Sequence, residues 1–155
     1  MRVESDVTTG KRVEQTIDSL NKLLRGELSA VETYTQATAR LRTSEIVVDL
    51  DECRRSHEER AEMLRQQVVR LGGEPAPSSG LWGSFARLVE RGAKLFGEKA
   101  AVAALEEGEE HGLRLYRDEL DKLDASTGAF VQQSLLSEQQ RTHRTVSGLK
   151  HQRLQ

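Results

Sequence analysis

The chain has 155 residues, of which 36% are hydrophobic and 31% charged, and its formal net charge is −2. This length suits one domain with a substantial core, and the balance of residues is typical of helices that each expose a wide polar face. No basic stripe and no pair of zinc-ligand motifs is present, so we expect no nucleic-acid partner. No window approaches the roughly 20 apolar residues of a membrane span, and the first residues lack the apolar core of a signal peptide. With one cysteine, Cys53, we expect a cytoplasmic protein without an internal disulfide.

The first third of the chain has the alternating three- and four-residue spacing of a helix that packs along one seam. The seam positions are Val13, Ile17, Leu20, Leu24, Glu27, Val31, Tyr34, Thr38 and Leu41. They predict one helix over about residues 10–43, with Thr8 or Thr9 as its N-cap. Within the stretch LNKLLRGELSAVETY, Glu27 takes a position where this spacing calls for an apolar residue.

A second helix is predicted over about residues 45–71, ending at the pair of glycines and two prolines in LGGEPAPSSG. Its seam is Val47, Leu50, Arg54, His57, Ala61, Leu64, Val68 and Leu71. A register through Ile46, Leu50, Cys53 and His57 fits equally well and moves Arg54 toward the rim. The sequence leaves both registers open.

Three further helices are predicted over about residues 80–96, 98–123 and 127–151. The first connection is short, so the first two helices should be antiparallel neighbours, and the long middle connection can cross the length of the domain. The whole chain, residues 1–155, is predicted to be a single all-α domain. We expect an antiparallel four-helix bundle with a short extra helix in the long crossover. Trp82 and Phe85 of that extra helix would either cover the bundle or form a contact between two copies. A homo-oligomer in the form of a dimer is the expected assembly, and no membrane partner is expected.

The sequence carries an internal echo. Gly26 and Glu27 are followed by Tyr34, and the pair at 108 and 109 is followed by Tyr116, with seven residues from glutamate to tyrosine in both. Glu52 and His57 are spaced like Glu138 and His143. The offset between copies is 82 for the first pattern and 86 for the second. The pattern indicates two helical hairpins related by an approximate twofold axis.

Four of these residues offer the ligand set of a metal site inside a helical bundle. Glu27 and Glu109 lie at seam positions of two helices, and His57 and His143 lie at seam positions of the other two. Two buried carboxylates repel each other, and a divalent ion would neutralise both. This mixed set of nitrogen and oxygen ligands suits iron, manganese or zinc better than calcium.

The same stretches carry a family resemblance. LNKLLRGELSAVETY resembles the first helix of bacterioferritin, where the matching glutamate is a metal ligand, and its Gly-Glu start resembles rubrerythrin. Over about residues 12–150 the chain resembles an uncharacterised bacterial family of ferritin-like four-helix proteins. The motifs that carry this resemblance are GELSAVETY, LRQQVVRLGGEP, SSGLWGSF, AALEEGEEHGLRLY and EQQRTHRTV. The resemblance implies a ferritin-like fold and a link to stress responses, but no assigned activity.

The chain departs from the ferritin pattern at the bridging ligands. A di-iron site needs a glutamate three residues before each histidine, where this chain has Arg54 and Gln140. Glu106, one turn before Glu109, is a substitute of the kind found in rubrerythrin. The complete set of candidate metal ligands is Glu27, His57, Glu106, Glu109 and His143.

Two interpretations of these residues remain open. In one, they hold iron or manganese in a vestigial or mononuclear site. In the other they form a buried polar network, in which Arg54 pairs with the glutamates and Tyr34 and Tyr116 donate to the remaining oxygens. We expect a non-catalytic protein without catalytic residues. The alternatives are a carboxylate-bridged iron or manganese oxidoreductase or iron-handling protein, and a structural dimerisation module.

Overall fold

The computed structural model describes residues 2–80 and 97–153, and the regular structure of these residues is entirely helical. The long helices are α1 (Arg2–Arg40), α2 (Val47–Arg70) and α4 (Glu98–Leu120). The last part of the chain contains α5 (Ala125–Phe130), the π-helix η2 (Val131–Leu136) and α6 (Ser137–Arg153), one directly after another. Over these described residues the predicted all-α class is confirmed. The predicted helix over 80–96, with Trp82 and Phe85, lies outside the described residues apart from its first position.

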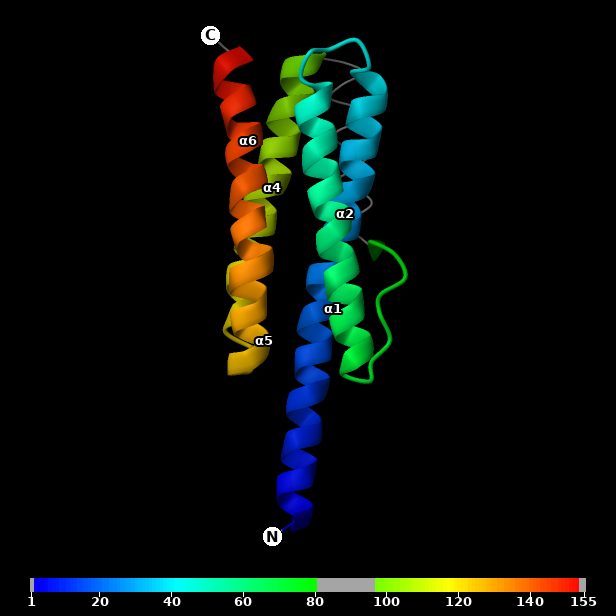
Figure 1. Cartoon of the computed structure of the whole chain (residues 1–155), viewed down its shortest axis with the longest axis vertical. Coiled ribbons are helices and arrows are strands. Elements are labelled where there is room, and N and C mark those ends of the chain that lie inside the picture. The colour runs from blue at the N-terminus through cyan, green and yellow to red at the C-terminus, as the bar shows by residue number, and fades with distance from the viewer. Residues whose placement is uncertain (1, 81–96, 154–155) are drawn as a thin grey trace.

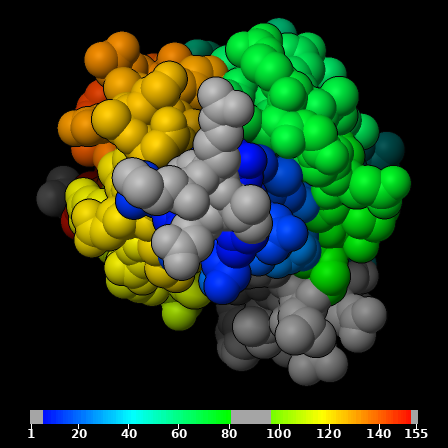
Figure 2. Space-filling view, turned by 90° about the horizontal axis from the view of Figure 1, so that it is seen from below, coloured from blue at the N-terminus to red at the C-terminus, as the bar shows by residue number. Residues whose placement is uncertain are grey.

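The helices form four rods, namely α1, α2, α4 and the continuous stretch α5–η2–α6. These rods lie side by side along the long axis (Figure 1). α1 packs against α2 and α4, and α6 packs against α4 and α2. In Figure 1, α1 and α6 run upward while α2 and α4 run downward, so α2 ends at the opposite end from the start of α4. Figure 2 looks along this axis and shows α2 on one side of α1, with α4 and the α5–α6 stretch on the other.

The structure corrects one predicted helix start and one predicted seam. α1 begins at Arg2, so Thr8 and Thr9 lie inside it, because nothing in the first residues stops a helix and Gly10 costs only about 1 kcal/mol.

In the last helix the predicted seam through Gln140 and His143 is one residue off, since Gln139 and Thr142 are the buried pair. Neighbouring polar residues offer no apolar contrast, and the wider turns of η2 precede them, so spacing alone misplaced these two positions. Leu136, Val146 and Leu149 of the same predicted seam are buried.

The second register considered for α2 is the one that the structure adopts. Ile46, Leu50, Cys53 and His57 are all buried, whereas Arg54 is partly exposed and pairs with Asp51 and Glu58 of its own helix. The predicted pairing of Arg54 with the interior glutamates is therefore wrong. At the rim, the guanidinium of Arg54 stays in contact with solvent. The inward positions on this part of α2 belong to Cys53 and His57.

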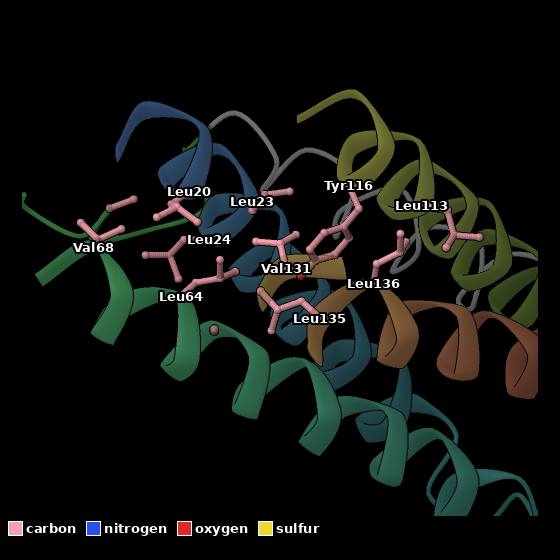
Figure 3. Packing of buried hydrophobic residues seen from close by; sticks show 12 residues of the cluster. Leu20, Leu23, Leu24, Leu64, Val68, Leu113, Tyr116, Val131, Leu135 and Leu136 are labelled. Atoms are coloured by element: carbon pink, nitrogen blue, oxygen red, sulfur yellow. The ribbon is translucent and has the colours of Figure 1, made fainter. Parts of the chain in front are cut away.

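The apolar core consists of two clusters. One is built around Leu20, Leu24, Leu64, Leu113, Val131 and Leu135 (Figure 3). The other is built around Ile46, Leu50, Cys53, Val102, Leu105 and Val146. On each of the four rods, buried polar residues occupy the positions between these clusters. The molecule therefore has a polar layer across its centre, with an apolar core on either side.

Candidate functional site

Glu27 of α1 and Glu109 of α4 both point into the centre, where they are 3% and 2% exposed. The helical period that places Leu20, Leu23 and Leu24 in the core also turns Glu27 inward. The predicted interior placement of both glutamates is confirmed. A buried carboxylate is costly unless it is paired and hydrogen-bonded, so the partners of each oxygen determine what this site is.

The two tyrosines bind the two glutamates crosswise. The Tyr34 hydroxyl of α1 donates to Glu109 Oε1 at 2.5 Å, and the Tyr116 hydroxyl of α4 donates to Glu27 Oε1 at 2.5 Å. Burial and the carboxylate beside it raise the pKa of each tyrosine well above its usual value. Both hydroxyls therefore stay protonated and act as donors. The predicted echo between the two halves of the chain thus appears in space as a reciprocal pair of contacts.

His57 of α2 lies between the two carboxylates. Its Nδ1 is 2.5 Å from Glu27 Oε2 and its Nε2 is 2.7 Å from Glu109 Oε1. A carboxylate oxygen only accepts hydrogen bonds, so both ring nitrogens must carry a proton, and the ring is an imidazolium. Burial and the charge of Arg60 lower the pKa of His57, but the two carboxylates outweigh them, so its pKa is raised above 6.5.

Arg60, one turn after His57, is the most deeply buried charge in the described part of the chain, with an exposure of 0%. Its Nη1 donates to Gln139 Oε1 at 2.5 Å and lies 3.4 Å from Glu27 Oε1. Its Nη2 donates to Thr142 Oγ1, and its Nε donates to the Ser56 carbonyl, each at 3.3 Å. Arg60 was not among the residues predicted from the sequence. The signal was available, because the register through Ile46, Leu50, Cys53 and His57 reaches Arg60 after three more residues.

Nη2 of Arg60 also lies 2.9 Å from His57 Nδ1. This cannot be a hydrogen bond if Nδ1 carries a proton. The shorter contact, 2.5 Å to Glu27, assigns that proton to the bond with the carboxylate. The guanidinium and the imidazolium are then two neighbouring cations, each held by the anions around them.

Gln139 and Thr142 of α6 complete the shell of Glu109. The Gln139 amide donates to Glu109 Oε2 at 2.8 Å and to the Glu109 carbonyl at 2.9 Å. The Thr142 hydroxyl donates to Glu109 Oε2 at 2.8 Å. Gly112 makes room for the amide, since a Cβ there would lie 2.5 Å from Gln139 Nε2. Both oxygens of Glu109 thus have two partners.

We call these six side chains, with the two tyrosines, the central charge cluster: Glu27, Tyr34, His57, Arg60, Glu109, Tyr116, Gln139 and Thr142. Two carboxylates and two cations give it a net charge of zero. Burial raises the pKa of both glutamates, but Arg60 and His57 more than reverse this, so both pKa values lie below 4.5. The cluster therefore contains four ionised side chains whose charges cancel.

The offset of 82 residues runs through the whole cluster. It relates Glu27 to Glu109 and Tyr34 to Tyr116. It also relates Arg60 to Thr142, which are in direct contact, and His57 to Gln139. The predicted pairing of His57 with His143 used an offset of 86 and is one helical turn too long. The offset of 82 makes Gln139 the counterpart of His57.

His143 and Glu106, the remaining candidate ligands, do not join the cluster. His143 of α6 lies beside Glu110 of α4, with 3.9 Å between Nε2 and Oε1. Glu106 is buried at 8% exposure and lies with Glu110 and His143 in a second group at the α4–α6 interface. The structure thus brings Glu27, His57 and Glu109 together and places Glu106 and His143 elsewhere.

A cavity of about 50 Å³ adjoins the cluster between α1 and α4. Small residues line it on both helices, including Gly26, Ala30, Gly108 and Gly112, together with both cluster glutamates. Its volume suffices for a few water molecules. The cavity could hydrate the cluster but is too small for a larger organic ligand.

Comparison with known protein families gives a match over most of the chain. Residues 15–122 match the model of a family described as a domain of unknown function, DUF2383. No curated protein and no solved structure matches the chain. Within the described residues, no helix combines the length and the apolarity that crossing a membrane requires.

Proposed function

Because the chain belongs to the DUF2383 family, a domain of unknown function, we propose its role from the central charge cluster. The protein is a non-catalytic, ferritin-like four-helix bundle in which a salt-bridged polar network takes the place of a metal centre. The directions of the four rods support this arrangement, as does the need for a long connection between the distant ends of α2 and α4 (Figure 1).

The side chains at the centre fit two metal ions poorly. Di-metal bundles use a glutamate from each of two helices and a Glu-x-x-His pair from each of the other two. Here Glu27 and Glu109 supply the first part, but the inward pairs are His57 with Arg60 and Gln139 with Thr142. Neither pair contains a carboxylate, and a guanidinium is always protonated and cannot ligate a metal. The ligand set of this centre therefore does not support iron or peroxide chemistry.

The single observation that carries this proposal is the position of Arg60. Its guanidinium is fully buried and 3.4 Å from Glu27, so it supplies positive charge where a metal would otherwise neutralise the carboxylates. A second cation in the same space would meet strong repulsion. The network instead links all four rods, because Glu27 is on α1, Arg60 on α2, Glu109 on α4 and Gln139 on α6.

Such a network fixes how the rods pack. Removing one partner leaves an unpaired buried charge, so helix registers that separate these residues are strongly disfavoured. The bundle would therefore present one defined outer surface. This suits a role in protein association rather than in iron oxidation.

The test compares the natural centre with one redesigned to hold metal. The redesigned chain carries His57→Glu, Arg60→His, Gln139→Glu and Thr142→His, which creates Glu-x-x-His on both helices. After loading with ferrous iron and dialysis, we expect the redesigned centre to retain iron and the natural one to retain none at Glu27 and Glu109. Iron that is bound by the natural chain, and lost in both Glu27→Gln and Glu109→Gln, would overturn the proposal.

A further inference from the structure

We propose that Glu106, Glu110 and His143 form a binding site for one divalent transition-metal ion, outside the central charge cluster. Each residue offers one ligand atom, and these atoms lie within 4.8 Å of one another. Metal ligands in a tetrahedral or octahedral shell lie roughly 3 Å apart for bonds of about 2 Å. Small side-chain rotations would therefore close the three atoms around one ion.

The backbone already positions these side chains. Glu106 and Glu110 are one turn apart on α4, so they lie on the same face of that helix. His143 comes from α6, which packs against α4, and its Nε2 is 3.9 Å from Glu110 Oε1. An ion bound here would join α4 to α6.

Two of the ligand atoms have unmet bonding capacity. Glu106 Oε2 and His143 Nε2 are buried, and neither makes a hydrogen bond among the described residues, although Lys150 Nζ lies 3.4 Å from Glu106 Oε2 as an ion pair. Glu106 as a whole is only 8% exposed. Leaving such atoms without a partner costs free energy, and buried polar groups without a partner are rare in folded proteins. A bound cation would satisfy both atoms at once.

Lys150 is the competing cation. Its Nζ is 3.4 Å from Glu106 Oε2, and its side chain is 32% exposed. The long lysine side chain can move its ammonium group into solvent when an ion arrives. A surface hollow lined by Glu110, His143 and three arginines, Arg114, Arg117 and Arg144, lies beside the site and gives an ion a path to it. Lys150 competes with an ion for Glu106 Oε2, so removing its charge should strengthen binding.

The ligand types indicate the metal. One imidazole and two carboxylates suit zinc, manganese or ferrous iron better than magnesium or calcium, which prefer oxygen ligands alone. Three protein ligands leave at least one coordination position for water or another small ligand. The site is therefore of the open type.

The experiment is a calorimetric titration of the full chain with Zn²⁺, repeated with Co²⁺, whose visible absorption reports on its ligands. We expect one ion per chain. His143→Ala and Glu110→Gln should each weaken binding at least about tenfold, while Lys150→Ala should strengthen it. His151→Ala is the matched control, because it removes an exposed histidine from the same helix and should leave binding unchanged.

The outcomes also separate this site from the centre. Absence of binding by the natural chain, or equal binding by His143→Ala and Glu110→Gln, overturns this proposal and leaves the proposed function standing. Binding that is lost in Glu27→Gln but kept in Glu110→Gln would place the ion in the central charge cluster and overturn both. Glu110 is half exposed, so its variant tests the site without disturbing the fold.

Discussion

At the scale of single residues, Arg60 and His57 decide the character of the centre. They provide the two positive charges that face Glu27 and Glu109, and none of the four is more than 3% exposed. A buried charge without its partner is far more costly than a surface charge without one. Substitutions at the centre and at the rim should therefore differ sharply.

Arg60→Met keeps much of the side-chain volume and removes the charge. It should lower the free energy of unfolding by about 3–5 kcal/mol, because Glu27 loses a buried cation and Gln139 loses a donor. Arg54→Met is the control on the same helix, where the pairs are partly exposed, and should change it by less than about 1 kcal/mol. Urea denaturation measures both. Equal effects of the two substitutions would contradict the role given to Arg60.

The pKa directions give the cluster a pH range of greatest stability. The pKa of His57 is raised above 6.5, so its stabilisation is complete below about pH 6.5 and is lost as pH rises through the folded-state pKa. The pKa values of Glu27 and Glu109 are lowered below 4.5, so their stabilisation is present above about pH 4.5 and is lost as pH falls through the folded values.

The contribution of the cluster should therefore be greatest between about pH 4.5 and 6.5. Denaturation from about pH 4.5 to well above pH 6.5, for the natural chain and for His57→Gln, isolates the part due to the histidine. The difference in unfolding free energy between the two proteins should shrink as pH rises from about 6.5 through the folded pKa of His57 and should level off above it. A difference that grows with pH above 6.5 would show that the folded state holds a neutral ring.

At the scale of helices, the apolar spacing predicted the helices better than it predicted the residues of the central charge cluster. The apolar period located the long helices and turned Glu27, Glu109 and both tyrosines inward. It could not choose between Gln139 and Gln140 or between Thr142 and His143, since hydropathy does not distinguish such neighbours. Arg60 was missed because an arginine reads as a surface residue unless its buried partners are known. The π-helix η2 had no sequence signal in the apolar pattern.

Close approach of α4 and α6 depends on Gly112. Gly112→Ala would place a Cβ 2.5 Å from Gln139 Nε2 and push the amide away from Glu109, which should cost about 1–3 kcal/mol. Gly148→Ala on α6 is the control, because nothing lies within 4 Å of the added Cβ. It should stabilise the chain by about 0.5–1 kcal/mol through helix propensity. Thermal unfolding measures both, and a stabilising Gly112→Ala would contradict the packing described.

At the scale of the whole molecule, two related halves share one polar layer. The reciprocal contacts of Tyr34 and Tyr116 follow the offset of 82, whereas α6 contributes Gln139 and Thr142 where α2 contributes His57 and Arg60. Each half of the chain thus supplies one glutamate and one tyrosine to the layer, whereas both cations come from the first half. The two halves of the chain should therefore respond differently to matched substitutions.

Tyr34→Phe and Tyr116→Phe remove the two equivalent hydroxyls. Glu109 keeps His57, Gln139 and Thr142 as donors, while Glu27 keeps His57 and a longer contact to Arg60. Both substitutions should lower the unfolding free energy by about 1–3 kcal/mol, with Tyr116→Phe at the higher end. Chemical denaturation of both variants tests this, and a larger loss in Tyr34→Phe would contradict the described distribution of partners.

The negative charges of buried Glu27 and Glu109 are balanced by Arg60 and by protonated His57 rather than by a metal ion. The most direct test is the ¹⁵N NMR spectrum of the His57 ring in the protein as purified, below the raised pKa and with His57→Gln for assignment. We predict that both ring nitrogens carry a proton and that each donates to a carboxylate. A ring nitrogen that is unprotonated and shifted by a bound metal would contradict the account.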